Sequence, residues 1–194
     1  AVSQIDIPVI SHEIGQYQIY PDYDEIDKYT GVLRARNLEK FRQDLQQSGM
    51  AGMDSIFQQA SGAWSALCYK AEMEAALRTE GLAGFQLLDL QDFSGQGTAL
   101  VGILDAFMDP KDVITPDKWK QSCNDVVLLL EFPKYCWTNN ETFSAELNIA
   151  NYSGSDITGD IAWMISAEDG EVIDRGEFSD PGILQGGITR AGEI

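Results

Sequence analysis

Residues 7–17, IPVISHEIGQY, decide the fold that this sequence predicts. A short run of mostly β-branched apolar residues stops at Ser11, His12 and Glu13, and Gly15 follows. This pattern is typical of a buried strand whose carboxyl end is exposed. In parallel α/β folds the chemistry lies at the carboxyl ends of the strands, and the only histidine of the chain stands there beside a glutamate. A strand-end turn whose polar groups merely face water is the other interpretation.

The chain is strongly acidic: its 194 residues include 31 Asp and Glu against 13 Lys and Arg, which gives a formal net charge of −18. Such a charge repels nucleic acid and anionic membrane surfaces, so we expect neither as a partner, whereas neutral sugars are compatible with it. No apolar run approaches the roughly 18 residues that a membrane helix needs. The chain starts in the lead-in to a strand and stops without a terminating pattern, which predicts a fragment of a longer protein.

Two patterns of helical period separate the first strand from a second one. Apolar residues recur every three to four positions over 37–47 and over 53–79, and a glycine follows each pattern. The second strand pattern covers residues 84–93, and a helical pattern over 98–107 comes after it. Strand, helices, strand and helix is the order of βα units in a parallel sheet.

From about residue 126 the period of the sequence changes to short strands separated by turn clusters. Asp169-Gly170 is a strong hairpin signal between two of these strands. Strands at intervals of about ten residues favour the opening half of an antiparallel sandwich, so the chain is expected to hold parts of two domains. The predicted strands are 126–132, 142–152, 157–166 and 171–178.

The segment after the first strand is rich in aromatic and acidic residues. Pro21 and Gly31 interrupt it, which predicts a long irregular loop. Aromatic rings stack on the C–H faces of sugars and carboxylates bind hydroxyl groups, so the loop suits sugar binding. The alternative is that its tyrosines only pack the loop against the rest of the chain. These tyrosines are Tyr17, Tyr20, Tyr23 and Tyr29.

Carboxylates at the ends of both strands point to glycoside hydrolysis. Glu13 ends the first strand, and Asp89 and Asp92 end the second; a glycosidase uses one carboxylate as acid/base and another as nucleophile or base. A triad of Ser11 and His12 with either aspartate lacks the glycine-flanked turn of hydrolases. A metal site from His12, Glu13 and Asp92 matches many accidental arrangements. A pair of catalytic carboxylates is therefore favoured over the triad and over the metal site.

Two segments resemble a known family. PVISHEIGQYQIYPDYDEIDKY (8–29) and GFQLLDLQDFSGQGTALVGILDAF (84–107) are similar to the last two βα units of a glycoside hydrolase family 2 barrel, that of the β-galactosidases and β-glucuronidases. The resemblance implies that residues 1–122 are the C-terminal part of a (β/α)8 TIM-barrel catalytic domain. It also implies that residues 123–194 are part of an immunoglobulin-like β-sandwich. Leu88 stands where the family usually has tryptophan.

The same resemblance implies a retaining β-glycosidase with Glu13 as the nucleophile. The acid/base glutamate would lie upstream of this chain, so the isolated chain is expected to be inactive. No cofactor and no metal are implied, and secreted relatives suggest the periplasm or the outside of the cell. A non-catalytic carbohydrate-binding fragment and an inverting glycosidase of a related clan are the alternatives. Residues expected to line the sugar pocket are Gln16, Tyr17, Asp89, Gln91 and Asp92, with His12 as a neighbour that points to the opposite face from Glu13.

Overall fold

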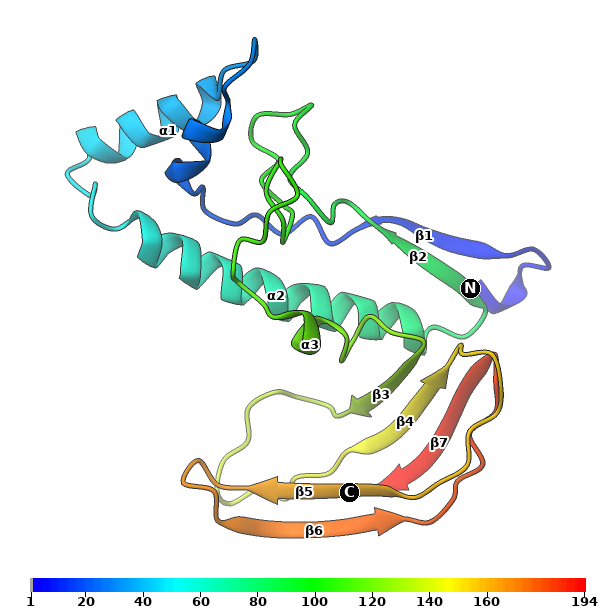
Figure 1. Ribbon diagram of the computed structural model, residues 1–194. Helices are drawn as coiled ribbons and strands as arrows, with labels where there is room; N and C mark the ends of the chain where they lie inside the picture. The colour runs from blue at the N-terminus through cyan, green and yellow to red at the C-terminus, as the bar shows by residue number, and fades with distance from the viewer. Residues whose placement is uncertain (1) are drawn as a thin grey trace. The chain divides into compact units, whose positions relative to one another are not determined.

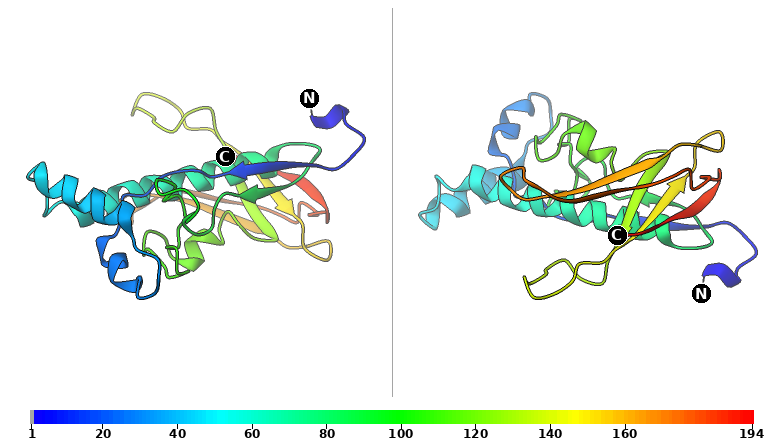
Figure 2. Two further views of the ribbon diagram at one scale, coloured as in Figure 1. Left: turned by 90° about the horizontal axis from the view of Figure 1, so that it is seen from above. Right: turned by 90° about the horizontal axis from the view of Figure 1, so that it is seen from below.

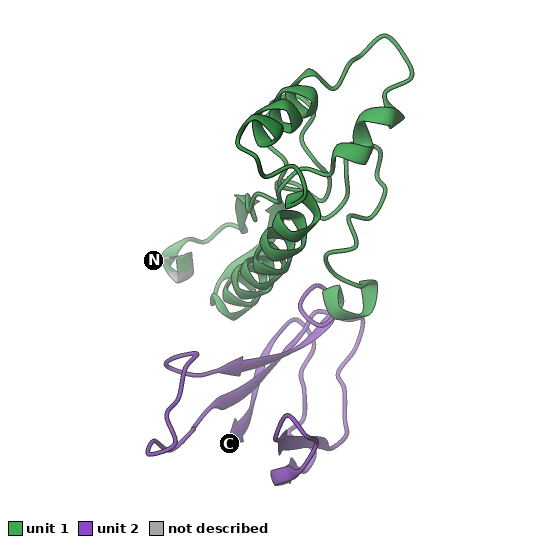
Figure 3. Ribbon diagram, turned by 90° about the vertical axis from the view of Figure 1, so that its left-hand side faces the viewer, with its two compact units in different colours: residues 1–120 green, residues 121–194 purple. Residues whose placement is uncertain are grey.

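The computed structural model describes residues 2–194, which form two compact units, 1–120 and 121–194 (Figures 1 and 3). The sequence places the domain boundary between residues 122 and 123. Among the described helices, none is long and apolar enough to cross a membrane. The elements of unit 1 are η1 (Val2–Gln4), β1 (Val9–Ile14), η2 (Tyr23–Lys28), α1 (Arg36–Gln47), α2 (Asp54–Arg78), β2 (Leu82–Leu87) and α3 (Pro116–Trp119).

Strands β1 and β2 form a two-stranded parallel sheet, and α1 and α2 lie in the connection between them. Parallel strands need such a crossover, because a tight turn can join only antiparallel neighbours. Helix α2 runs alongside the sheet (Figures 1 and 2). Ile14 pairs with Leu87, and the N–H of Leu88 donates to the carbonyl oxygen of Ile14 at 2.9 Å. The polar residues at the carboxyl ends of both strands therefore lie at the same edge.

Helix α2 buries one of its faces. Ser65, Tyr69 and Met73 recur at helical spacing and are all buried. The Tyr69 hydroxyl donates to the carbonyl oxygens of Asp89 and Val101, at 3.1 and 2.6 Å. The face of α2 that packs on the rest of unit 1 is thus also the face that holds the loop after β2. Exposed apolar residues of the same helix are Ile56, Trp64 and Leu67.

A small core forms where the aromatic loop meets α1. Tyr23, Ala35, Leu38 and Leu45 are buried together. The loop tyrosines contact other rings edge to face. Tyr20 contacts Tyr23 in this way, and the centroid of the Tyr20 ring also lies 5.3 Å from that of the Phe57 ring. Tyr29 likewise meets Phe107, and Tyr17 meets Tyr69. All four tyrosines of the loop therefore take part in its packing.

The prediction that residues 1–122 contain the last two βα units of a (β/α)8 TIM barrel is wrong. A barrel βα unit needs a helix after each strand, and residues 98–107 contain none. Leu104 instead forms isolated bridges to Gln91 and Pro110, and a Cβ atom on Gly102 would lie 2.1 Å from the backbone of Gln91. This segment therefore folds back on the end of β2 through cross-loop hydrogen bonds, and β1 and β2 remain a two-stranded sheet.

Unit 2 contains a three-stranded antiparallel sheet, in the order β3-β4-β7, and a separate hairpin of β5 and β6. The hairpin predicted at Asp169-Gly170 is confirmed, and Gly170 has a φ of +89° in its turn. A Cβ atom on Gly192 would lie 2.4 Å from Phe178 Cε1, so the hairpin packs on the sheet. The strands are β3 (Val126–Glu131), β4 (Glu146–Asn151), β5 (Ile161–Ser166), β6 (Val172–Phe178) and β7 (Gly187–Glu193).

The predicted partial immunoglobulin-like sandwich is wrong as well. It was expected from four strands, whereas unit 2 has one three-stranded sheet, completed by a fifth strand, β7, that pairs along the whole of β4, and a single two-stranded hairpin. The sheet is centred on β4, whose residues Leu147 and Ile149 are buried with Leu129 of β3. The fold of this chain is therefore a set of small sheets with helices in unit 1, and neither the barrel segment nor the sandwich segment is present in residues 2–194.

Candidate functional site

Glu13 has an unusual backbone conformation at the end of β1. Its φ is +58°, in the left-handed region that disfavours residues with a side chain, and its side chain is 51% exposed. The register with β2 explains the geometry. Ser11 pairs with Phe85 and Ile14 with Leu87, so His12 and Glu13 together face the single residue Gln86. This is a β-bulge, which changes the direction of the side chains it contains.

The bulge brings the side chains of His12 and Glu13 together. His12 Nε2 lies 3.5 Å from Glu13 Oε1, and its Nδ1 lies 2.7 Å from Gln86 Oε1. The expectation that His12 points away from Glu13 assumed regular alternation along the strand, and the bulge removes that alternation. Because the Gln86 oxygen can only accept, the Nδ1–H donates to it, and Nε2 faces the Glu13 carboxylate. Gln86 was not predicted; its sequence signal is one polar residue inside an apolar strand.

Helix α2 supports the turn after Glu13. Glu72 Oε2 accepts a hydrogen bond from the Gly15 N–H at 2.9 Å. Burial raises the pKa of the Tyr17 hydroxyl, and the hydrogen bond and charge of Glu72 raise it further. Gln16 is exposed, and its Nε2 donates to the carbonyl oxygen of Glu13 at 3.2 Å. Of the predicted site residues, Gln16 is thus placed beside Glu13, while Tyr17 is held against α2.

At the end of β2 the three predicted polar residues have different surroundings. Asp89 is partly exposed, and its Oδ1 accepts the N–H of Leu90 at 3.0 Å. Gln91 is also partly exposed and bridges to Leu104. Asp92 is only 2% exposed and lies 2.6 Å from Lys111 Nζ through its Oδ1. Asp89 and Gln91 can therefore meet a ligand, and Asp92 is engaged inside the protein.

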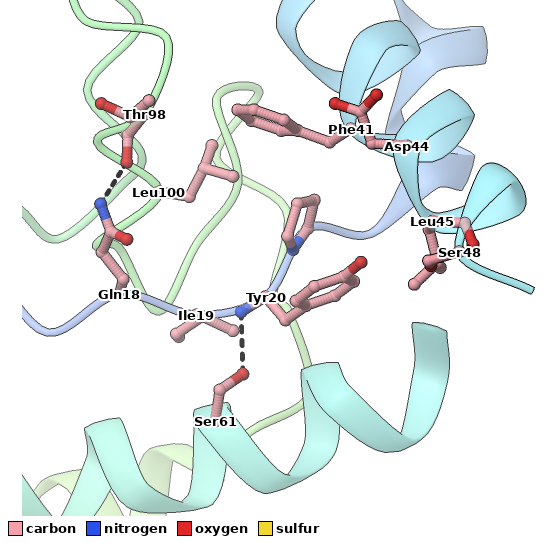
Figure 4. Close-up of a pocket in the computed structure, with 11 residues that line it drawn as sticks. Gln18, Ile19, Tyr20, Phe41, Asp44, Leu45, Ser48, Ser61, Thr98 and Leu100 are labelled. Carbon is pink, nitrogen blue, oxygen red and sulfur yellow. Dashed lines mark hydrogen bonds between the residues drawn. The ribbon is translucent and has the colours of Figure 1, made fainter. Parts of the chain in front are cut away.

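A pocket of about 650 Å³ lies elsewhere in unit 1 (Figure 4). Its polar groups are bonded within the protein: Gln18 Nε2 donates to the Thr98 carbonyl, and Ser61 Oγ accepts the N–H of Tyr20 at 2.8 Å. The remaining wall is mostly apolar, so the pocket suits an apolar group better than a sugar. Neither Glu13 nor any residue expected to line the sugar pocket lines it, but Tyr20 of the aromatic loop does. Its apolar lining residues include Ile19, Pro21, Phe41, Leu45 and Leu100.

Within residues 2–194 no group of three or more His, Cys, Asp or Glu side chains is arranged to hold a metal ion. The polar groups around Glu13 are instead donors and acceptors from β1, β2 and α2. A half-exposed carboxylate beside an imidazole can act as a nucleophile, as a base, or as an acceptor for sugar hydroxyl groups.

The model of a family described as a domain of unknown function (DUF8488) matches residues 141–194. The matched residues contain β4 to β7 of unit 2, so Glu13 and its neighbours lie outside them. None of the curated proteins compared with the chain matches it.

Proposed function

We propose that this chain supplies the nucleophilic carboxylate of a retaining β-glycosidase, Glu13. The observation that carries the proposal is the bulge at the end of β1, which holds Glu13 at a φ of +58° with its carboxylate half-exposed beside His12. Such a conformation costs about 1–3 kcal/mol in a residue other than glycine, and residues held in this way cluster at functional sites.

In the proposed reaction the Glu13 carboxylate attacks the anomeric carbon of a β-glycoside. An ester forms between Glu13 and the sugar while a second carboxyl group protonates the leaving oxygen, and water then hydrolyses the ester. The two carboxyl groups of a retaining enzyme stand about 5 Å apart. No residue of this chain is proposed as the second carboxyl group, which acts as acid/base. The isolated chain is therefore expected not to turn over substrate.

His12 is proposed as a positioning residue. Its Nδ1–H is held by Gln86 at 2.7 Å, which directs Nε2 toward Glu13 Oε1. In this position the ring lies 3.5 Å from one carboxylate oxygen of Glu13 and leaves the other oxygen free to attack. Gln16, Asp89 and Gln91, together with Tyr17 at the turn, are proposed to bind sugar hydroxyl groups. Asp92 is left out of this set because its carboxylate is buried against Lys111.

Covalent trapping tests the proposal. A preparation that contains this chain and hydrolyses a β-glycoside is incubated with a 2-deoxy-2-fluoro β-glycoside, digested, and analysed by mass spectrometry. We expect the label on Glu13, and we expect Glu13→Gln to lower turnover by several orders of magnitude. The matched control is Glu80→Gln, an exposed glutamate in the turn between α2 and β2. Turnover without any label points to an inverting enzyme, and a label on another residue removes Glu13 from the role.

A further inference from the structure

The pocket of Figure 4 is assembled from segments that lie far apart in the chain: the loop after β1, helix α1 and the loop after β2. Hydrogen bonds join these segments. The N–H of Ile19 donates to the carbonyl oxygen of Leu100 at 2.9 Å, and Asn37 Nδ2 of α1 donates to the carbonyl oxygen of Gly97 at 2.8 Å. The walls of the pocket are therefore fixed by bonds within the protein before any ligand binds.

Most of the wall is aromatic or aliphatic. Tyr20, Phe41 and Leu100 pack on the small core of unit 1 but are only partly buried, and all three line the pocket. Figure 4 shows the Phe41 ring extending from α1 toward Leu100. A wall of this kind accommodates the apolar body of a small molecule, and the volume of about 650 Å³ lies in the range of about 300–1,000 Å³ that small-molecule sites occupy.

Asp44 is the one charged residue among the described residues that line the pocket. It follows Phe41 by three positions on α1, so the two side chains lie on the same side of the helix. Asp44 Oδ1 pairs with Lys40 Nζ, whereas Oδ2 has no partner within residues 2–194. Both side chains of this pair are at least half exposed, and such pairs are weak. The carboxylate can therefore accept a second cation.

We propose that this pocket binds a small organic cation, a protonated amine carried on an aromatic or other apolar body. The apolar body packs against Phe41, Leu100 and Tyr20, and the ammonium group binds Asp44 Oδ2 beside the aromatic rings, whose faces also attract cations. An anion is disfavoured by Asp44 and by the net charge of −18. The site is separate from Glu13 and does not depend on the glycosidase proposal.

The preference for a positive charge distinguishes this proposal from general apolar binding. A neutral apolar ligand would use the same wall and would leave Asp44 without a role. Three probes with the same phenyl ring and two-carbon linker therefore form the test: phenethylamine, phenethyl alcohol and hydrocinnamate. At pH 7 the amine is positively charged and the hydrocinnamate is negatively charged.

Each probe is titrated into the ¹⁵N-labelled 194-residue chain, and amide shifts are followed by NMR. We expect phenethylamine to shift the amides of Tyr20, Phe41 and Leu100 and to bind about tenfold more tightly than phenethyl alcohol, with hydrocinnamate the weakest. Equal affinities for the amine and the alcohol would overturn the proposal. It would also be overturned by amide shifts confined to other parts of the chain, or by no shifts at millimolar probe.

Variants then assign the charge preference to Asp44. Asp44→Asn should lower the affinity for phenethylamine to that for the alcohol and leave the alcohol unaffected. Asp27→Asn, an exposed aspartate on η2 that does not line the pocket, makes the same change in net charge and should alter neither affinity. Lys40→Met removes the competing ammonium group and should strengthen amine binding. An equal loss in Asp44→Asn and Asp27→Asn would contradict the proposal, because the acidic chain as a whole would then attract the amine. If a variant does not fold, the three probes on the unchanged chain still decide the matter.

Discussion

The ring of Tyr69 occupies the space where a side chain on Gly15 would stand. A Cβ atom on Gly15 would lie 2.1 Å from Tyr69 Cε1, and the φ of Gly15 is +91°. The hydroxyl of the same tyrosine holds the carbonyl oxygens of Asp89 and Val101. Tyr69 therefore ties together the end of β1, helix α2 and the loop after β2, which are the segments that surround Glu13.

Gly15→Ala is expected to destabilise unit 1 by about 3 kcal/mol or more, because it combines a steric clash with a strained backbone. The matched control is Gly49→Ala, where φ is +74° but nothing lies within 4 Å of the added carbon. That control should cost only about 1 kcal/mol, from the backbone alone. Urea unfolding of the two variants measures the difference, and equal costs would show that the Tyr69 ring moves aside freely.

Lys111→Met is expected to cost about 3–5 kcal/mol, because it leaves the Asp92 carboxylate buried without its cation. The comparison is Lys40→Met, which breaks an exposed pair with Asp44 one turn away on α1. Exposed pairs of this kind contribute about 0.3–0.5 kcal/mol. Thermal or urea unfolding distinguishes the two. A small effect of Lys111→Met would mean that Asp92 becomes protonated when its partner is removed.

The sequence located both strands of unit 1 because each is a short apolar run ended by polar residues and glycine. It predicted a helix at 98–107 that does not form: the apolar spacing is helical, but Gly102 packs on the backbone of Gln91 and Leu104 bridges across the loop. Strand β7 was missed because its GITRAGE sequence has little apolar alternation and depends on pairing with β4.

In the candidate site, too, the sequence predicts what depends on neighbouring residues and misses what depends on tertiary contacts. Glu13 at a strand end follows from local pattern, but its approach to His12 depends on a bulge that only the register with β2 reveals. Asp92 looked like an exposed strand-end carboxylate, and its burial follows from Lys111, which lies 19 positions further along the chain. Such contacts between distant residues leave no periodic signal in a single sequence.

The left-handed backbone conformation of Glu13 can be tested by the stability of two variants. At a φ of +58° glycine should be preferred over alanine, so Glu13→Gly should be more stable than Glu13→Ala by about 1 kcal/mol. Elsewhere in a strand the order is reversed. Urea midpoints of the two variants measure this, with Glu177→Gly and Glu177→Ala as the matched pair, because Glu177 is an exposed strand glutamate that pairs with Ala162 in regular register. The opposite order at position 13 would show that the chain relaxes to an ordinary strand conformation there.

The buried carboxyl of Glu25 predicts how the stability of unit 1 depends on pH. Its pKa is raised from 4.5 to about 7 in the folded chain, so the folded state holds a proton that the unfolded state releases between these values. The contribution to stability is therefore complete below pH 4.5, falls as the pH rises, and is lost above about pH 7. A shift of this size corresponds to about 3 kcal/mol. Asp105 acts in the opposite sense at lower pH, because hydrogen bonds from Lys28 and from the N–H groups of Asp109 and Phe107 lower its pKa despite burial. Subtracting the stability curve of Glu25→Gln from that of the unchanged chain isolates the Glu25 contribution. A difference that does not vary with pH would show that the pKa of this carboxyl is the same in the folded and unfolded states.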